Sequence, residues 1–209
     1  MAGFPQIVAI IKDIFTIVCV CIASSVALRG LSTWRRQLRG NTQYDLARRL
    51  LLSAYKLRDS LEGVRTLGIT SMEAAHALKE TGISMEGMSQ RESVREEKRA
   101  VYEVRWRRVQ DAKSELSVNC FEAQVLWGEE AKAAYQAINS CVQKLWAAIV
   151  MEFEFEAHGV TETDPERLLN RRKVLWPLWA KPEDDQYMVE LNRSIQQLED
   201  LVKPHLVLS

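Results

Sequence analysis

Two pairs of glutamate and histidine have the spacing of metal ligands on a helix. Glu73 and His76 lie three residues apart, and Glu154 and His158 lie four apart. Helical metal sites combine Glu-x-x-His pairs with further glutamates from facing helices, but the Glu-x-x-His spacing occurs only once here. Two ligands are fewer than a zinc site uses. We therefore expect both histidines to be ordinary helix residues, and no metal site is predicted.

The four cysteines are the other residues that could carry chemistry. Cys19 and Cys21 lie in an apolar N-terminal run, and Cys120 and Cys141 lie in apolar stripes of helical spacing. A thiol in apolar surroundings has a raised pKa and behaves as a small hydrophobic side chain. We expect reduced thiols, while a Cys120–Cys141 bridge stays open if the domain faces an oxidising compartment.

No motif points to a nucleotide or a nucleic acid. The sequence contains neither GxxxxGK[ST] nor GxGxxG, and its formal net charge is zero. Arg105, Arg107 and Arg108 surround Trp106, but acidic residues nearby favour a solvated, ion-paired helix face. No cofactor, small-molecule substrate or nucleic-acid partner is therefore predicted.

The N-terminus predicts a membrane anchor. Residues 7–28 are apolar apart from Lys12 and Asp13, and about 20 apolar residues cross a bilayer as a helix. Four arginines follow before the first acidic residue, Asp45, and such a positive cluster favours the cytoplasmic side. We predict a single-pass protein of the cell inner membrane with a cytoplasmic C-terminal domain.

A cleaved signal peptide is the alternative to the anchor. Residues 14–22 would form its apolar core, and residues 25–27 offer small side chains for cleavage. The positive charge expected before such a core is cancelled, because Asp13 follows Lys12. The anchor is therefore preferred.

Two sets of residues follow from the anchor. Small side chains at every fourth position allow close packing between transmembrane helices, and those of the span are Cys19, Ala23 and Ala27. Basic and aromatic side chains just beyond a span contact lipid headgroups, and these are Arg29, Trp34, Arg35, Arg36 and Arg39.

Beyond the anchor, apolar residues recur three and four apart, which predicts long helices. The first stripe consists of Ala47, Leu50, Ala54, Leu57, Leu61 and Val64. A short helix follows, with Ser71 as its cap and Gly82 as its end, and residues 81–89 form a connection. The next stripe consists of Val101, Val104, Val109, Ala112, Leu116, Cys120 and Ala123, with one slip in the spacing after Val104. Gly128 then indicates a break or a close contact.

The C-terminal half continues the helical pattern. One stripe consists of Ala131, Ala134, Ile138, Val142, Leu145, Ile149 and Phe153. Residues 152–156, EFEFE, alternate like a strand but continue this stripe, so we predict a helix end there, with Gly159 as the stop. Asp164 and Pro165 predict the start of another helix. Residues 176–179, WPLW, predict a turn whose indoles pack on the bundle, and a final helix should start near residue 184 and end at Pro204.

These elements predict an all-α fold: an N-terminal transmembrane helix followed by an antiparallel four-helix-type bundle. The domains are residues 1–31 and residues 32–209. Residues 34–40, WRRQLRG, with residues 44–49 and 55–59, resemble segments of uncharacterised bacterial single-span helical proteins. That resemblance implies no activity, and no family is assigned on it.

The predicted function is non-enzymatic. The chain is expected to self-associate or to bind a protein partner at the cytoplasmic face, with membrane lipids as further partners. The alternative is a membrane-active effector or channel component built from oligomerised transmembrane helices, with Lys12 and Asp13 beside the pathway.

Overall fold

The computed structural model describes residues 24–26, 29, 34, 41–158, 163–177 and 184–206. The chain divides into two compact units, Met1–Asp45 with Val207–Ser209 and Leu46–Leu206. Every regular element among the described residues is a helix, which confirms the all-α prediction. The labelled helices are α2 (Ser71–Thr81), α3 (Gln90–Trp127), α4 (Glu129–His158), α5 (Pro165–Leu175) and α6 (Gln186–Leu206). Residues 41–65 form an unlabelled helix before α2.

The predicted localisation in the inner membrane is corrected. None of the described helices is long and apolar enough to cross a membrane, because each carries charged residues along its length. Residues 7–28, on which the span and the channel alternative depend, lie outside the described residues except for residues 24–26. The single-pass topology is therefore not supported.

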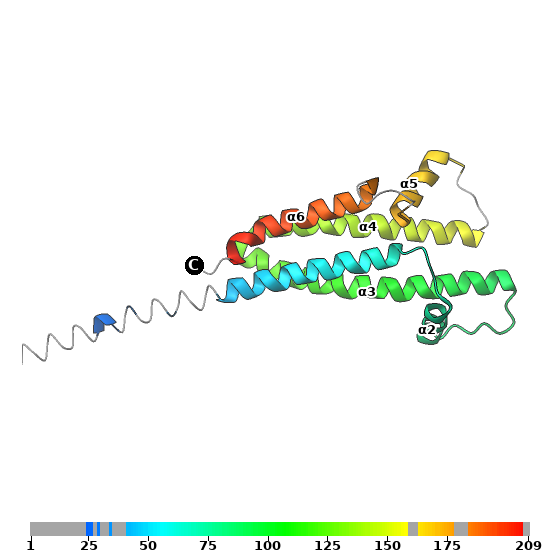
Figure 1. Ribbon diagram of the computed structural model, residues 1–209, viewed down its shortest axis with the longest axis horizontal. Coiled ribbons are helices and arrows are strands. Elements are labelled where there is room, and N and C mark those ends of the chain that lie inside the picture. The colour runs from blue at the N-terminus through cyan, green and yellow to red at the C-terminus, as the bar shows by residue number, and fades with distance from the viewer. Residues whose placement is uncertain are drawn as a thin grey trace, which may run out of the picture. The chain divides into compact units, whose positions relative to one another are not determined.

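One apolar core joins helical residues 46–65 with α3, α4 and α6. Figure 1 shows these four long elements lying alongside one another. Every residue of the first predicted stripe has an exposed fraction of 1% or less. Burial of each large aliphatic side chain contributes about 1.5–3 kcal/mol, so the stripes of the sequence are the core of the fold.

The direction of residues 46–65 relative to α3 follows from the ion pairs between them. Arg49 pairs with Glu122 and Lys56 with Glu115, at 2.9 and 2.7 Å, so residues 46–65 run antiparallel to α3. Within the same interface the buried Asn119 amide donates to Ser53 Oγ at 3.2 Å. A buried polar pair of this kind favours one register over its neighbours.

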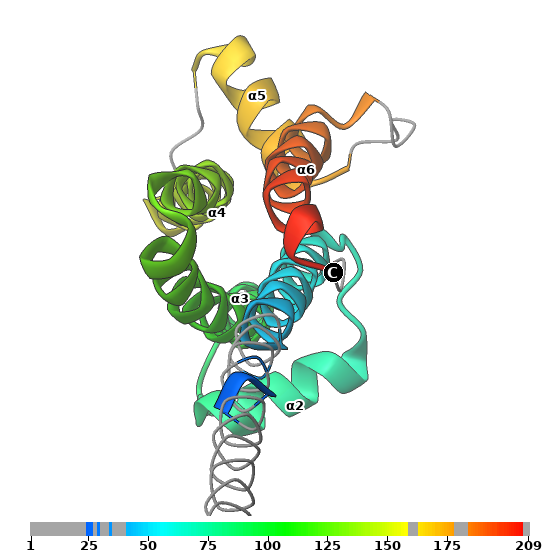
Figure 2. The ribbon, with the colours of Figure 1, turned by 90° about the vertical axis from the view of Figure 1, so that its left-hand side faces the viewer.

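A second, smaller core explains the slip in the α3 stripe. Val101 and Val104 pack with Ala100 against Ala74 and Ala77 of α2, whereas Val109 belongs to the main core. Figures 1 and 2 show α2 on the far side of α3 from α4. Tyr102 and Trp106 of the same turns belong to the main core. The spacing slips after Val104 because Val101 and Val104 lie on the face of α3 that packs on α2, and Val109 lies on the face that packs in the main core.

The helix ends agree with the sequence in most places. Gly82 ends α2 in the left-handed conformation, with φ of 71°, and Asp164 caps α5, whose first residue is Pro165. Gly128 separates α3 from α4 and has φ of 87°. No atom lies within 4 Å of a Cβ built on it, so it serves a break rather than a close contact.

Two local predictions are wrong, and two others fall outside the described residues. Thr70, not Ser71, caps α2, since its side chain accepts from the Glu73 amide. The last helix does not end at Pro204, because α6 continues to Leu206; a proline in the last turn removes only one helical hydrogen bond. The EFEFE run is helical, as predicted. Gly159 and Trp179 are not among the described residues.

Candidate functional site

A cleft of about 730 Å³ lies between the N-terminal half of α3 and the C-terminal half of α4. Its walls have an aromatic and aliphatic part, consisting of Tyr102, Trp106, Trp146, Ile149, Val150, Phe153 and Ala157. Its polar part consists of Arg95, Glu96, Arg99, Glu103, Arg107, Gln110 and Glu154. The cleft is large enough for several side chains of a binding partner.

Two aromatic pairs form the floor of the cleft. The rings of Trp106 and Trp146 stack with centroids 4.7 Å apart and an interplanar angle of 25°. Tyr102 and Phe153 meet edge to face at 5.4 Å. Trp106 is only 9% exposed, but 45% of Trp146 is exposed. The inner indole thus supports an outer one that is open to a partner.

The spacing of the chain places these rings on one face of each helix. Tyr102 and Trp106 are four residues apart on α3, and Trp146, Val150 and Phe153 are four and three apart on α4. The α5 end secures the floor, because Trp176 Nε1 donates to Tyr102 Oη at 3.2 Å. Indole and phenol rings held in this way present apolar area at little entropic cost.

The rim of the cleft carries charges of both signs. Arg107 pairs with Glu80 at 2.7 Å and with Glu103 at 3.4 Å. Arg95 and Arg99 both lie within 4 Å of Glu96. Three arginines and three glutamates line the cleft in all, so it has no formal net charge to attract a phosphate backbone.

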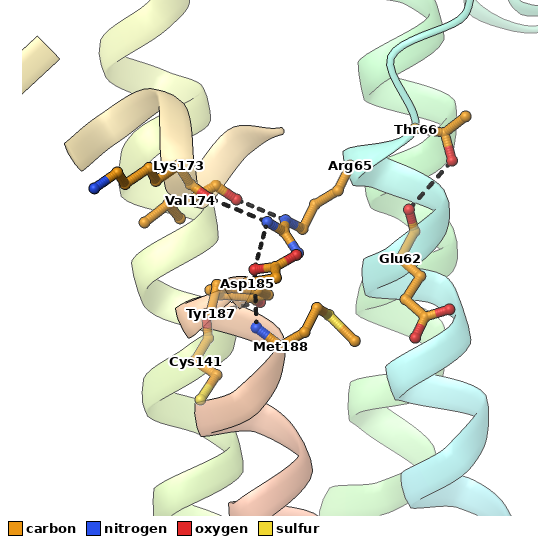
Figure 3. Close-up of polar contacts among 9 residues, drawn as sticks. All are labelled: Glu62, Arg65, Thr66, Cys141, Lys173, Val174, Asp185, Tyr187 and Met188. Carbon is orange, nitrogen blue, oxygen red and sulfur yellow. Dashed lines mark hydrogen bonds and ion pairs between the residues drawn. The ribbon is translucent and has the colours of Figure 1, made fainter. Parts of the chain in front are cut away.

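A buried arginine joins three elements at the far end of residues 46–65. Arg65 is 3% exposed. Its guanidinium donates to both carboxylate oxygens of Asp185, at 2.7 and 3.0 Å, and to the Lys173 and Val174 carbonyls, at 3.0 and 2.7 Å. Figure 3 shows this group between the helices. All of these contacts hold helix ends together, so the cluster is structural.

Tyr187 and Cys141 lie beside the same cluster. The guanidinium of Arg65 lies 4.6 Å from the centre of the Tyr187 ring, and Tyr187 Oη donates to the Cys141 carbonyl at 3.2 Å (Figure 3). Burial raises the pKa of the Tyr187 hydroxyl and of the Cys141 thiol. Both groups therefore stay protonated and are poor nucleophiles at neutral pH.

The reactivity of the thiols tests whether Cys120 and Cys141 are buried and protonated in the folded protein. Cys120 and Cys141 are buried and free, and burial raises the pKa of Cys120 to about 12. We expect iodoacetamide to leave both residues unmodified in the folded protein at pH 8 and to label them after unfolding in guanidinium chloride. Peptide mass mapping separates them from Cys19 and Cys21. Rapid labelling of either in the folded protein would contradict the structure.

The predicted solvated, ion-paired face around Trp106 is correct for Arg107 and Arg108, which are exposed, and wrong for Arg105, which is a second buried arginine. Arg105 is 6% exposed. It donates to both carboxylate oxygens of Glu73 at 2.8 Å, and to the Thr66 and Gly68 carbonyls at 2.7 and 2.8 Å. It thereby holds α2 and the preceding loop on α3.

The possible metal ligands do not come together. Glu73 is bound to Arg105, His76 lies 3.6 Å from Glu80, and His158 lies 3.3 Å from Glu154. In the part of the chain that the structure describes, no three histidine, cysteine or acidic side chains are close enough to hold a metal ion.

The residues predicted for membrane contact are mostly outside the described part. Arg29 and Trp34 are described as exposed helix residues. Arg35, Arg36 and Arg39, and the predicted packing residues Cys19, Ala23 and Ala27, are not among the described residues. Their roles stay predictions.

The chain matches no protein-family model, no curated protein and no solved structure. Its functional interpretation therefore depends on its own side chains. The sequence analysis did not predict Trp146 and Val150 as site residues, because they lie outside the apolar stripe that defines the buried face of α4. The signal was present as aromatic residues at helical spacing, Tyr102 with Trp106 and Trp146 with Phe153.

Proposed function

We propose that this chain is a non-enzymatic helical protein that binds an amphipathic helix of a protein partner in the cleft between α3 and α4. We further propose that residues 46–65, α3, α4 and α6 act as an antiparallel four-helix-type bundle that holds the cleft rigid. The observation that carries the proposal is the half-exposed Trp146 stacked on the buried Trp106.

The length of the cleft suits a helix. Its lining runs from Arg95 to Gln110 on α3, which is about 22 Å at 1.5 Å per residue. A partner helix of about four turns has this length and presents anchors at positions i, i+3, i+4 and i+7. A compact metabolite would leave most of such a cleft uncovered.

The chemistry of the cleft has the pattern of a protein interface. Binding energy in interfaces concentrates in aromatic and arginine side chains at the centre, surrounded by a polar rim. Trp146 and Val150 are the exposed apolar groups of the floor, and the ion-paired arginines of the rim lie across from them on α3. We expect the partner helix to carry apolar anchors flanked by residues of both charges.

The test compares three forms of the full chain as immobilised bait in a lysate of its source cells. The cleft variant carries Trp146→Ser and Val150→Ser. The control variant carries Leu169→Ser and Val189→Ser, which alter exposed apolar residues outside the cleft. We expect a polypeptide that wild type and control retain and that the cleft variant loses about 30-fold or more, since a hot-spot tryptophan contributes about 2 kcal/mol or more.

Circular dichroism and thermal unfolding check that the three forms are equally folded. A photocrosslinking amino acid at position 150 should form an adduct with the same polypeptide, and one at position 189 should not. Equal retention by all three forms, or no polypeptide above the background of blank resin, would refute the proposal.

A further inference from the structure

The C-terminal half of α3 exposes an apolar stripe that its core does not use. Val118, Phe121 and Val125 are 63%, 63% and 85% exposed. They lie three and four residues apart, so their side chains share one face of the helix. Leu116 and Cys120, which point into the main core, lie on another face of the same turns.

Leu52 extends this stripe from the neighbouring helix. The pairs Arg49–Glu122 and Lys56–Glu115 bracket the interface between residues 46–65 and α3. Leu52 lies midway between its two basic residues, and Val118 lies between the two glutamates, so Leu52 and Val118 occupy neighbouring turns. Leu52 is 54% exposed. We call Leu52, Val118, Phe121 and Val125 the α3 apolar face.

Polar side chains and mostly ion-paired charges border the face. The exposed or half-exposed neighbours on α3 include Ser114, Ser117 and Gln124. Glu115 and Glu122 pair with Lys56 and Arg49 of the same chain, and Glu129 pairs with Lys132 and accepts from Gln124. Arg48, one turn before Leu52, is an exposed basic residue at the border. By contrast, the N-terminal part of the same helix reads RESVREEKR. Exposed apolar patches with a polar border mark interaction sites.

The stripe is complementary to itself when it is reversed. It reads valine, phenylalanine, valine, with the phenylalanine near its centre. If two copies of α3 cross antiparallel about a two-fold axis beside Phe121, Val118 of each copy meets Val125 of the other. A two-fold interface uses the same patch on both subunits, and an uncharged patch can do so without like-charge repulsion.

We propose that the α3 apolar face binds a second copy of this chain, with the two α3 helices antiparallel, and that the protein is a homodimer. The face begins at Val118, about 12 Å along the helix from the last cleft residue on α3, Gln110. The cleft and the dimer contact are therefore separate sites, and neither proposal depends on the other.

The test measures the mass of the full chain in solution by light scattering and sedimentation. Wild type should have twice the chain mass of 24.0 kDa at about 100 µM. Phe121→Glu places two like charges across the axis and should raise the dissociation constant about 100-fold or more. Val94→Glu, at an exposed valine on the same helix, is the matched control and should stay dimeric.

Two mixing experiments test the geometry. Phe121→Glu and Phe121→Lys chains should each be monomeric alone and should associate when mixed. In a Cys19→Ser, Cys21→Ser background, Val118→Cys and Val125→Cys chains should form a disulfide when mixed and not separately.

The outcomes that overturn the proposal are distinct. A monomeric wild type, or an assembly that Phe121→Glu leaves intact, excludes the face as a dimer contact. Disulfides that form only between identical chains exclude the antiparallel arrangement. The cleft variant Trp146→Ser, Val150→Ser should remain dimeric, so failure of partner binding and failure of dimerisation are told apart.

Discussion

Replacement of Arg65 by methionine is expected to lower the free energy of unfolding by about 3–5 kcal/mol, because breaking a buried ion pair leaves an uncompensated charge. Asp185 loses its partner while its side chain is only 8% exposed. The Lys173 and Val174 carbonyls lose donors at the same time. Methionine keeps the aliphatic stem, so the loss reports the guanidinium rather than a cavity. Urea unfolding followed by circular dichroism measures it.

Two further variants separate this effect from a general loss of charge. Arg58→Met removes an arginine from the same helix whose partner, Asp59, is solvent-exposed, and we expect a change of no more than about 1 kcal/mol. Arg65→Met with Asp185→Asn removes the buried charge and keeps the oxygen that accepts from the Met188 amide. This double variant should be more stable than Arg65→Met alone. Equal effects for Arg65→Met and Arg58→Met would contradict the buried cluster.

Replacement of Arg105 by methionine should release α2 and its preceding loop while the main core stays folded. Arg105 supplies the bidentate contact to Glu73 and the donors to the Thr66 and Gly68 carbonyls. Hydrogen bonds to charged groups each contribute about 1.5–3 kcal/mol. Because α2 otherwise contacts α3 only through Ala74, Ala77, the partly buried Leu78 and an exposed pair between Glu80 and Arg107, we expect amide protection in α2 to fall about 30-fold or more. Hydrogen exchange with mass spectrometry resolves the two regions.

The pH dependence of amide protection in α2 tests whether the contact between Arg105 and Glu73 is responsible for that protection. The hydrogen bond from Arg105 lowers the pKa of Glu73. A carboxylate with a lowered pKa in the folded state stabilises that state above its ordinary pKa, and the contribution is lost as the pH falls through the lowered value. Wild-type α2 should therefore lose protection, relative to intrinsic exchange, on acidification. In Arg105→Met this additional loss should be absent; its persistence would assign the acid effect to another group.

The helices and most of their ends could be predicted from local patterns. Apolar residues three and four apart share a helix face, and the stripe from Ala47 to Val64 is buried throughout. Gly82 ends α2 because glycine readily adopts the left-handed conformation, and Asp164 caps α5 because its carboxylate accepts from the first free amides. The EFEFE run follows the helix that it continues, since a stripe already buried outweighs five alternating residues.

The tertiary structure decided what covers each face. The partners of Arg65 and Arg105 lie up to 120 and 39 residues away in the chain, so spacing alone did not distinguish a buried arginine from a solvated one. Trp146 and Phe121 both lie outside the main stripes, yet Trp146 lines a cleft and Phe121 lies on the solvent-exposed surface. Periodicity states which side chains share a helix face, because that depends only on helical geometry. Which element packs on that face depends on the path of the whole chain, and this is why the candidate sites appeared only in the folded protein.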